Sequence, residues 1–330
     1  MLFQNVLSVT WQQIVMWCIG GLLIYLAIAK DMEPSLLLPI GFGAILVNIP
    51  GVDAVQPGGA LITLFKAGID NELFPLILFI GIGAMIDFGP LLSNPKLMIF
   101  GAAAQFGIFF TLCLASIFFD LNDAASIAVI GAADGPTSII VAQELGSKYL
   151  GSIMVAAYSY MSLVPIIQPP IIKLLTTRKE RMIRMPYEQK DVSRLTRILF
   201  PIIITVIAAL IAPKAASLIG FLMFGNLIRE CGVLNSLSET AQKVLANLIT
   251  LFLGLTIAVR MQAEYFLTKQ TFLIMALGLV AFIFDTAGGV LVAKVINLFL
   301  PKEKKLNPMI GACGISAFPM SARVVYKMAI

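Results

Sequence analysis

One short segment combines residues that can do chemistry: Gly131-Ala-Ala-Asp134-Gly135-Pro136-Thr137-Ser138, inside an otherwise apolar stretch. Burying a charged side chain in a membrane costs about 2.5–3.5 kcal/mol on insertion scales, so Asp134 is a functional candidate by default. Pro136 lacks an N–H and Gly135 tolerates left-handed backbone, so a helix must unwind here. The freed carbonyls, the carboxylate and the hydroxyls of Thr137 and Ser138 form an all-oxygen set that hard cations prefer. A helix cap in a loop is the alternative.

A second polar segment in apolar surroundings runs from Asn307 to Arg323 and also contains proline and glycine. Asn307 offers a neutral carbonyl oxygen where the first segment offers a carboxylate. One negative charge with neutral oxygens suits a monovalent ion, whereas several carboxylates would indicate Ca²⁺. Ser316 and Arg323 lie two turns apart on one face if this segment is helical. Arg323 could then hold a carboxylate, and an arginine that snorkels from a helix end is the alternative.

Two further polar sites lie within apolar runs. Tyr158, Ser159 and Tyr160 lie together in mid-span, and the Tyr160 hydroxyl could hydrogen-bond an aspartate or shuttle a proton, although a buried structural tyrosine fits equally well. Asp285 precedes the pair Gly288-Gly289. Helix packing explains the glycines, but it leaves the acid unexplained. Asp285 is therefore a further candidate.

The composition shows what must position these residues. Of 330 residues, 59% are hydrophobic and 12% charged, and there is no histidine. Soluble domains are about 45–50% apolar and about 25% charged. The chain is therefore predicted to be an all-α polytopic membrane protein, with room for roughly ten crossings of about 20 residues each. The absence of histidine excludes His-liganded zinc or haem and Ser-His-Asp hydrolysis within this chain, and the four cysteines show no CxxC spacing.

Positive charge is concentrated between Lys173 and Arg197, where eight Lys/Arg and three Asp/Glu occur. Lys and Arg resist translocation, so residues 176–195 are predicted to form a cytoplasmic loop. Because the loop is flanked by membrane spans, docking of a cytoplasmic partner fits it and nucleic-acid binding does not. The loop divides a single membrane domain into N-terminal spans with a re-entrant element over 1–72, a first repeat over 73–175 and a second repeat over 196–330. Leu36–Ile49 is the expected re-entrant or half-helix element.

An internal repeat follows from sliding the chain on itself by 173 residues. This offset places Phe79-Ile-Gly81 on Phe252-Leu-Gly254 and Asp134-Gly-Pro136 on Asn307-Pro308. Paired interrupted segments in two halves indicate an inverted-repeat, transporter-like bundle with two broken helices at the bilayer midplane. The counterpart of the span Ser152–Leu175 would begin near residue 325, so we expect the second repeat to be truncated before its last helix.

The two broken segments resemble the signature regions of a known family, the β subunits of sodium-translocating, biotin-dependent decarboxylases that act on oxaloacetate, methylmalonyl-CoA or glutaconyl-CoA. The segments Gly83–Pro90, Ala156–Ser162 and Asp285–Gly289 are also similar to that family. The resemblance covers the chain from Leu73 to its end. It implies a lyase and translocase: a carboxyl group arrives on biotin, the β subunit releases it as CO₂ while consuming a proton, and Na⁺ moves outward.

The resemblance also implies roles for particular residues. The Na⁺-binding aspartate of the family falls on Asp134, and its conserved tyrosine falls on Tyr160. Ala132 is often glycine in relatives, and relatives continue past this C-terminus with another helical segment. Taken with the residue-based reasoning, the expected Na⁺ ligands are Asp134, Thr137, Ser138, Asn307, Gly311 and Ser316; the expected catalytic residues are Asp134, Tyr160, Ser316 and Arg323, with Asp285 as a further candidate.

Partners and location follow from the same resemblance. It implies a carboxyltransferase α subunit, a biotin carrier protein that bears carboxybiotin, and a small membrane γ or δ subunit, assembled as an oligomeric complex in the bacterial cytoplasmic (inner) membrane. The partners would then choose the acid that is decarboxylated. The main alternative is a secondary carrier without chemistry, either a Na⁺/H⁺ antiporter or a Na⁺-coupled organic-anion symporter. A membrane scaffold would leave Asp134 and Asn307 without a purpose.

Overall fold

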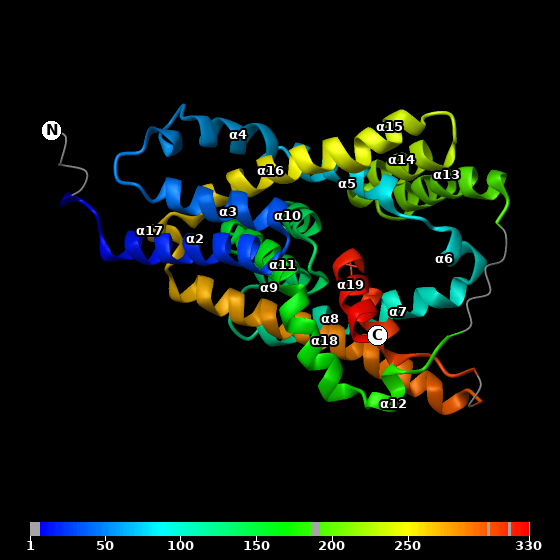
Figure 1. Ribbon diagram of the computed structural model, residues 1–330. Coiled ribbons are helices and arrows are strands. Elements are labelled where there is room, and N and C mark those ends of the chain that lie inside the picture. The colour runs from blue at the N-terminus through cyan, green and yellow to red at the C-terminus, as the bar shows by residue number, and fades with distance from the viewer. Residues whose placement is uncertain (1–6, 186–191, 302–303, 316–317, 330) are drawn as a thin grey trace. The chain divides into compact units, whose positions relative to one another are not determined.

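The computed structural model describes residues 7–185, 192–301, 304–315 and 318–329, and every regular element in these ranges is a helix (Figure 1). The predicted all-helical, polytopic fold is thus confirmed. Within the described ranges, six helical runs are long and apolar enough to cross a membrane. They number fewer than the length would allow because some apolar stretches form short helices, such as α3 (Pro34–Val47). The six runs are α2 (Trp11–Lys30), Pro95–Ala115, α11 (Leu150–Leu175), α13 (Arg194–Ile211), Asn235–Met261 and α18 (Lys269–Phe299).

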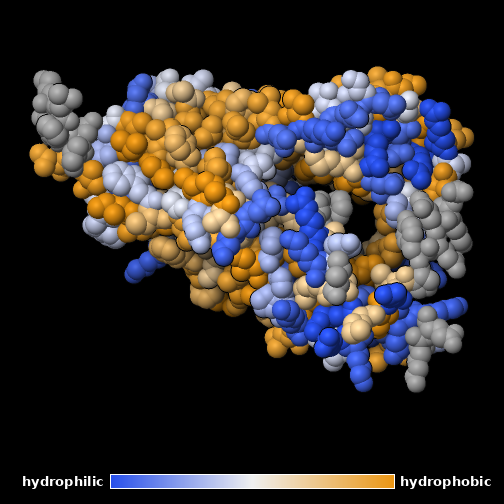
Figure 2. Space-filling model, viewed as in Figure 1, coloured by the Kyte–Doolittle hydropathy of each residue, from blue (hydrophilic) through white to orange (hydrophobic). Residues whose placement is uncertain are grey.

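A bent pair of helices forms one further candidate span. The helical stretch Asp53–Gly68, which includes α4 (Ala60–Gly68), meets α5 (Leu73–Met85) at an angle of 57°. The outer surfaces of the spans are apolar, as contact with lipid requires. Figure 2 shows hydrophobic side chains around α4 and α16 (Ala246–Ile257). On α13 a whole series of large apolar side chains is exposed: Leu199, Ile202, Ile203, Val206, Ile207, Leu210 and Ile211.

The chain folds into two compact units. Residues 1–95 and 189–263 form unit 1, and residues 96–188 and 264–330 form unit 2. Each half of the chain thus contributes first to unit 1 and then to unit 2. The predicted repeats, 73–175 and 196–330, consequently each supply helices to both units.

Two helix pairs in unit 1 pack through glycines. In the pair α5 and α14 (Ala216–Glu230), a Cβ on Gly83 would lie 1.8 Å from the carbonyl oxygen of Leu222. In the pair α3 and α16, a Cβ on Gly43 would lie 2.5 Å from the Cβ of Ala258, which follows α16. Both pairs therefore need glycine for their backbones to approach.

A buried asparagine ties each of these pairs together. The Asn226 side chain donates from α14 to the carbonyl of Ile86 at 2.9 Å, directly after α5. The Asn48 side chain, directly after α3, donates to the carbonyl of Met261 at 2.8 Å. In both cases the amide satisfies a carbonyl that a helix end would leave unpaired. This likeness supports the internal repeat, which itself stays a prediction.

Unit 2 is built around α18. This helix packs against α8 (Phe106–Ala115), α11 and two 3₁₀ segments, η3 (Val129–Ala132) and η8 (Pro308–Gly314). Gly289 of α18 faces Gly311 of η8 so closely that a Cβ on Gly289 would lie 2.0 Å from the Gly311 carbonyl oxygen. A Cβ on Gly288 would lie 2.8 Å from the Cβ of Phe106, so the predicted packing role is confirmed for both glycines. The unit also contains α7 (Met98–Ala103), α9 (Leu121–Ala128), α10 (Gly135–Glu144), α12 (Arg178–Arg181) and α19 (Phe318–Ala329).

This close approach predicts an asymmetry between two glycine-to-alanine substitutions. Gly289→Ala should destabilise the protein by about 1–3 kcal/mol, because the methyl group overlaps backbone that cannot rotate away. Gly101→Ala is the matched control, because a Cβ there meets nothing within 4 Å and alanine favours a helix over glycine by about 0.5–1 kcal/mol. Thermal unfolding in detergent measures both, and equal midpoints for the two variants would contradict the packing described.

Candidate functional site

The first break is a short unwound stretch between two helical segments. After η3, Ala133 adopts a left-handed conformation with φ of 51°, Asp134 is extended, and α10 begins at Gly135 with Pro136 in its first turn. The helix therefore unwinds where Gly135 and Pro136 predict it. A non-glycine residue in the left-handed region is uncommon and is often found at functional sites.

Asp134 and the two following hydroxyls gather at this break. The Thr137 N–H and hydroxyl donate to the two Asp134 carboxylate oxygens at 3.4 and 2.6 Å, and the Ser138 hydroxyl donates to the Asp134 carbonyl at 2.8 Å. Asp134 and Thr137 are partly exposed, whereas Ser138 is fully buried. Asp134 thus caps α10, as the alternative reading held. A carboxylate keeps further lone pairs, so capping leaves room for a cation.

The charge of this cluster suits a monovalent cation. Among the described residues, no group of three or more His, Cys, Asp or Glu side chains could hold a metal ion. One carboxylate with neutral hydroxyl and carbonyl oxygens offers a single negative charge, whereas Ca²⁺ sites gather several acidic ligands. The three residues predicted for the first break thus lie together, and their Na⁺ binding stays a prediction.

Tyr158 is the tyrosine that lies against this cluster. A Cβ on Gly135, which follows Asp134 directly, would lie 2.3 Å from the Tyr158 ring. The Tyr158 hydroxyl is buried and has no hydrogen-bond partner in the described part of the chain. Tyr160, the predicted residue, instead donates to the carbonyl of Met275 on α18. Two positions along a helix differ by about 200° in direction, so the two rings face different neighbours.

Asn307 begins the second broken segment and is fully engaged in local contacts. Its side-chain oxygen accepts the Met309 N–H at 3.1 Å and so caps η8, with Pro308 directly after the cap. Its side-chain nitrogen donates to the carbonyls of Arg181 and Ile183, at 2.8 and 3.1 Å. These bonds fasten the segment that follows α12, and they do not run to Asp134.

The structure does not test the predicted offset of 173 residues between the breaks. The helix resumes at Gly135 after the first break, and the described part of α19 runs from Phe318 onward. At an offset of 183, the sequence Pro-Thr-Ser138 pairs with Pro-Met-Ser321. Both serines are fully buried, and the Ser321 hydroxyl has no partner among the described residues. Sequence reasoning missed Ser321, although the shared Pro-x-Ser spacing could have pointed to it.

The two broken segments share one core. Ala133 at the first break belongs to the same buried apolar cluster as Met309, Ala312 and Ile315 of the second. Both η3 and η8 also pack against α11 and α18. The Gln168 side chain of α11 donates to the Ala312 carbonyl at 3.1 Å, which satisfies an unwound backbone group. The structure thus brings the segments together, while their depth in the bilayer stays a prediction.

Three other predicted residues have different surroundings. Ser316 lies outside the described residues, so the two-turn argument for Ser316 and Arg323 is not tested. Arg323 is exposed on α19. Gly311 turns its carbonyl toward Gly289 of α18, so its backbone serves packing.

Asp285 connects the first break to α8. Its side chain is fully buried, and one carboxylate oxygen accepts the Ile108 N–H at 3.1 Å, in the first turn of α8. The other oxygen lies against Gly131, where a Cβ would be only 2.4 Å away, and has no hydrogen-bond partner in the described ranges. Asp285 thus caps a neighbouring helix, where the positive end of the helix dipole favours a carboxylate. This contact accounts for the acid that the sequence left unexplained.

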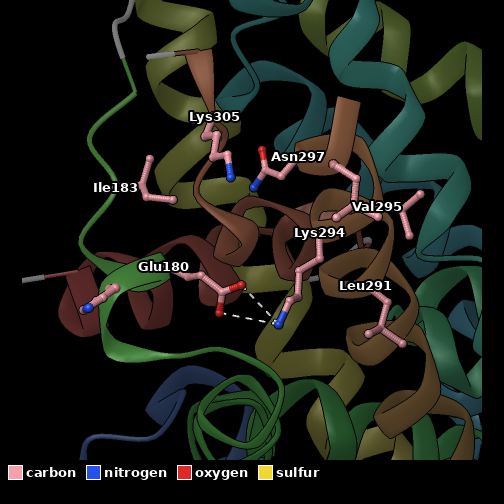
Figure 3. Close-up of a pocket in the computed structure, with 9 residues that line it drawn as sticks. Glu180, Ile183, Leu291, Lys294, Val295, Asn297 and Lys305 are labelled. Carbon is pink, nitrogen blue, oxygen red and sulfur yellow. Dashed lines mark hydrogen bonds and ion pairs between the residues drawn. The ribbon is translucent and has the colours of Figure 1, made fainter. Parts of the chain in front are cut away.

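The turn at α12, which Asn307 fastens, is also held by charge. The Thr177 N–H donates to Glu180 at 2.6 Å, and the Lys294 ammonium lies 3.1 Å from the same carboxylate (Figure 3). Partial burial acts to raise the pKa of Glu180, but the hydrogen bonds from Thr177 and Lys294 outweigh it and hold the pKa below its ordinary value of 4.5.

Together these features define a polytopic helical membrane protein with two proline-broken segments and one acidic oxygen cluster, a pattern typical of ion-translocating proteins. A sequence model of the Na⁺-transporting oxaloacetate decarboxylase beta subunit matches residues 12–330. The chain belongs to this family of membrane decarboxylase subunits. The family membership confirms the resemblance described above, and it does not favour a carrier without chemistry.

Individual relatives are similar over nearly the whole chain. The methylmalonyl-CoA decarboxylase subunit beta of Veillonella parvula is 49% identical over 96% of this chain and 84% of its own length. The glutaconyl-CoA decarboxylase subunit beta of Acidaminococcus fermentans is 48% identical over 96% of this chain and 83% of its own length. The oxaloacetate decarboxylase beta chain of Klebsiella pneumoniae is 43% identical, with 96% and 87% covered.

The Glu180 contacts predict a pH-dependent contribution to stability. Because the folded-state pKa is lowered, the stabilisation is present above the ordinary glutamate pKa and is lost as the pH falls through the folded value. Glu180→Gln should therefore lower the free energy of unfolding by about 0.2–1 kcal/mol at pH 7, and the difference from wild type should vanish in acid. Thermal midpoints across pH test this against Glu264→Gln, an exposed acid on α17 (Ala263–Phe266). A difference in thermal midpoint between wild type and Glu180→Gln that stays unchanged in acid would contradict this prediction.

Proposed function

We propose that this chain releases CO₂ from carboxybiotin and uses the free energy to move Na⁺ outward, as the membrane β subunit of a decarboxylase sodium pump. The observation that carries the proposal is the cluster of Asp134, Thr137 and Ser138 at a helix break. It joins the family membership to a place where a single Na⁺ can bind. The carrier alternative has no comparable observation in its favour.

The reaction needs little from the protein beyond an environment and a proton. Cleavage of the bond between the biotin nitrogen and the carboxylate leaves its electron pair on nitrogen, which takes up one proton, and CO₂ departs. A site with little water favours this step because the carboxylate charge disappears, and a placed acid supplies the proton. The coupling then lies in Asp134: a bound cation favours the ionised carboxylate, so protonation of Asp134 expels Na⁺.

The proposal also assigns roles to further residues at both breaks. We propose that the Tyr158 hydroxyl lies beside Asp134 and either handles the proton or binds the ion. The close approach of the Tyr158 ring to Gly135 supports this assignment. Ser321, whose hydroxyl is buried without a described partner, and Ser316 would supply hydroxyls from the second break. Arg323 would meet the carboxylate of carboxybiotin on the exposed side of α19. Asn307 and Gly311 would position the second break, and Asp285 would position the first.

Partners and location complete the proposal. The relatives are named as subunits of decarboxylases, which fits a multi-subunit complex. We propose a carboxyltransferase α subunit, a biotin carrier protein and a small membrane γ or δ subunit as partners. The apolar spans fit a multi-pass protein, and we place it in the bacterial cytoplasmic membrane.

The proposed role of the Asp134 carboxylate predicts that its removal strongly reduces decarboxylation, which distinguishes a pump from a carrier. Proteoliposomes supplied with free carboxybiotin should show Na⁺-stimulated CO₂ release, and Asp134→Asn should reduce it by about 100-fold or more, because both the ion ligand and the titrating group are lost. Asp120→Asn, which alters an exposed acid paired with Lys148, is the control and should be active. Na⁺ exchange at full rate without consumption of carboxybiotin would favour the carrier.

The two tyrosines predict opposite results in a matched pair. Tyr158→Phe removes a hydroxyl without a described partner, so the fold should keep its thermal midpoint while Na⁺-dependent decarboxylation falls at least tenfold. Tyr160→Phe removes the hydrogen bond to Met275 and should cost about 0.5–1.5 kcal/mol of stability, with a smaller loss of activity. Decarboxylation rates of both variants at saturating and limiting Na⁺ show which tyrosine acts at the ion site. Full activity of Tyr158→Phe would remove Tyr158 from the site.

A further inference from the structure

A large basic cavity lies at the end of α11 in unit 2. Its volume is about 880 Å³, and it is lined by the last turn of α11, by α12 with the segment that follows it, and by the end of α19. Hydrophilic side chains gather where α12 and the end of α19 lie (Figures 1 and 2). No acidic side chain is among the described residues that line it, but five cationic ones are: Lys173, Arg178, Arg181, Arg184 and Lys327.

A neighbouring cavity shows how this chain compensates charge elsewhere. It has a volume of about 530 Å³ and contains Lys179, Lys294 and Lys305 (Figure 3). There Glu180 lies 3.1 Å from Lys294 and neutralises part of the charge. Among the described residues that line the basic cavity at the end of α11 there is no such acid, so these cations repel one another unless a negative charge compensates them.

The basic cavity is held in shape by hydrogen bonds. The Arg181 guanidinium donates to the Thr176 carbonyl at 2.6 Å, and the Asn307 side chain donates to the carbonyls of Arg181 and Ile183. The segment that carries Arg178, Arg181 and Arg184 is thus fixed to the core of unit 2. Guanidinium groups match the geometry of phosphate oxygens through paired hydrogen bonds. A multiply basic, pre-shaped cavity therefore fits a phosphate group better than a single carboxylate.

The surroundings of this cavity indicate where the phosphate comes from. Lys173 lies in the last turn of the membrane-spanning helix α11, and Leu174 beside it is 86% exposed. Met182, which lines the cavity, is 66% exposed. Cations with exposed apolar side chains at the end of a span match the level of lipid headgroups. We propose that this cavity binds the phosphate headgroup of an anionic phospholipid; the proposal does not depend on decarboxylase activity.

Lipid titration of the purified complex tests this proposal. The protein, isolated with its partner subunits and stripped of lipid in neutral detergent, is titrated with phosphatidylglycerol, with phosphatidylcholine of the same chains, or with inorganic phosphate. Bound lipid is counted by native mass spectrometry, and the thermal midpoint is followed. The test variant is Arg184→Gln with Lys327→Gln. The matched control is Lys179→Gln with Lys305→Gln, which removes the same charge from the neighbouring cavity.

The expected result is at least tenfold tighter binding of phosphatidylglycerol than of phosphatidylcholine, lost in the test variant and kept in the control. Three results would overturn the proposal. Equal losses in both variants would show unspecific attraction by charge. Inorganic phosphate as effective as the lipid would show a site for a soluble anion. A test variant that binds lipid normally but releases its partner subunits would show a surface for an acidic protein.

Discussion

The need to satisfy unwound backbone and one carboxylate inside apolar surroundings governs unit 2. A helix that breaks in a membrane exposes polar groups that lipid cannot satisfy. Here the Asp134 carboxylate accepts from Thr137, Ser138 returns to the Asp134 carbonyl, and Gln168 reaches the Ala312 carbonyl of the second segment. The close helix contacts of this unit can be read as the packing that keeps both broken segments in place.

Much of the first break could be predicted because its causes are local. Gly135 and Pro136 stop a helix whatever surrounds them, and hydroxyls three and four residues after an acid reach back to it. The all-helical membrane fold was predictable from the apolar composition, but the length overestimated the number of spans, because six helical runs in the described ranges are long and apolar enough to cross, or seven with the bent pair. The bounds of the short helices were not predictable, because packing decides where they end.

The rest of the site depends on contacts that sequence does not display. Tyr158 and Tyr160 are chemically alike, and only the direction in which α11 packs brings the first against Gly135. Asn307 looks like a partner for Asp134 until its amide is seen to hold the carbonyls of Arg181 and Ile183. The offset of 173 residues between the breaks stays a prediction, and an offset of 183 would pair the Pro-x-Ser spacing at Ser138 with the one at Ser321.

The position of Asp134 at a helix start bears on how the proposed ion would be released. The helix α10 begins directly after the first break, and the start of a helix carries partial positive charge from its unpaired N–H groups. The start of a helix therefore repels a cation unless the negative charge of a carboxylate outweighs this partial positive charge. Asp134 supplies this negative charge at α10, and the described part of α19 contains no acid. When Asp134 is protonated, the hydroxyl oxygens remain but the electrostatic attraction is gone, and the helix dipole then favours departure of the ion. In the proposed mechanism, a helix start with one titratable group would thus bind Na⁺ and release it on protonation.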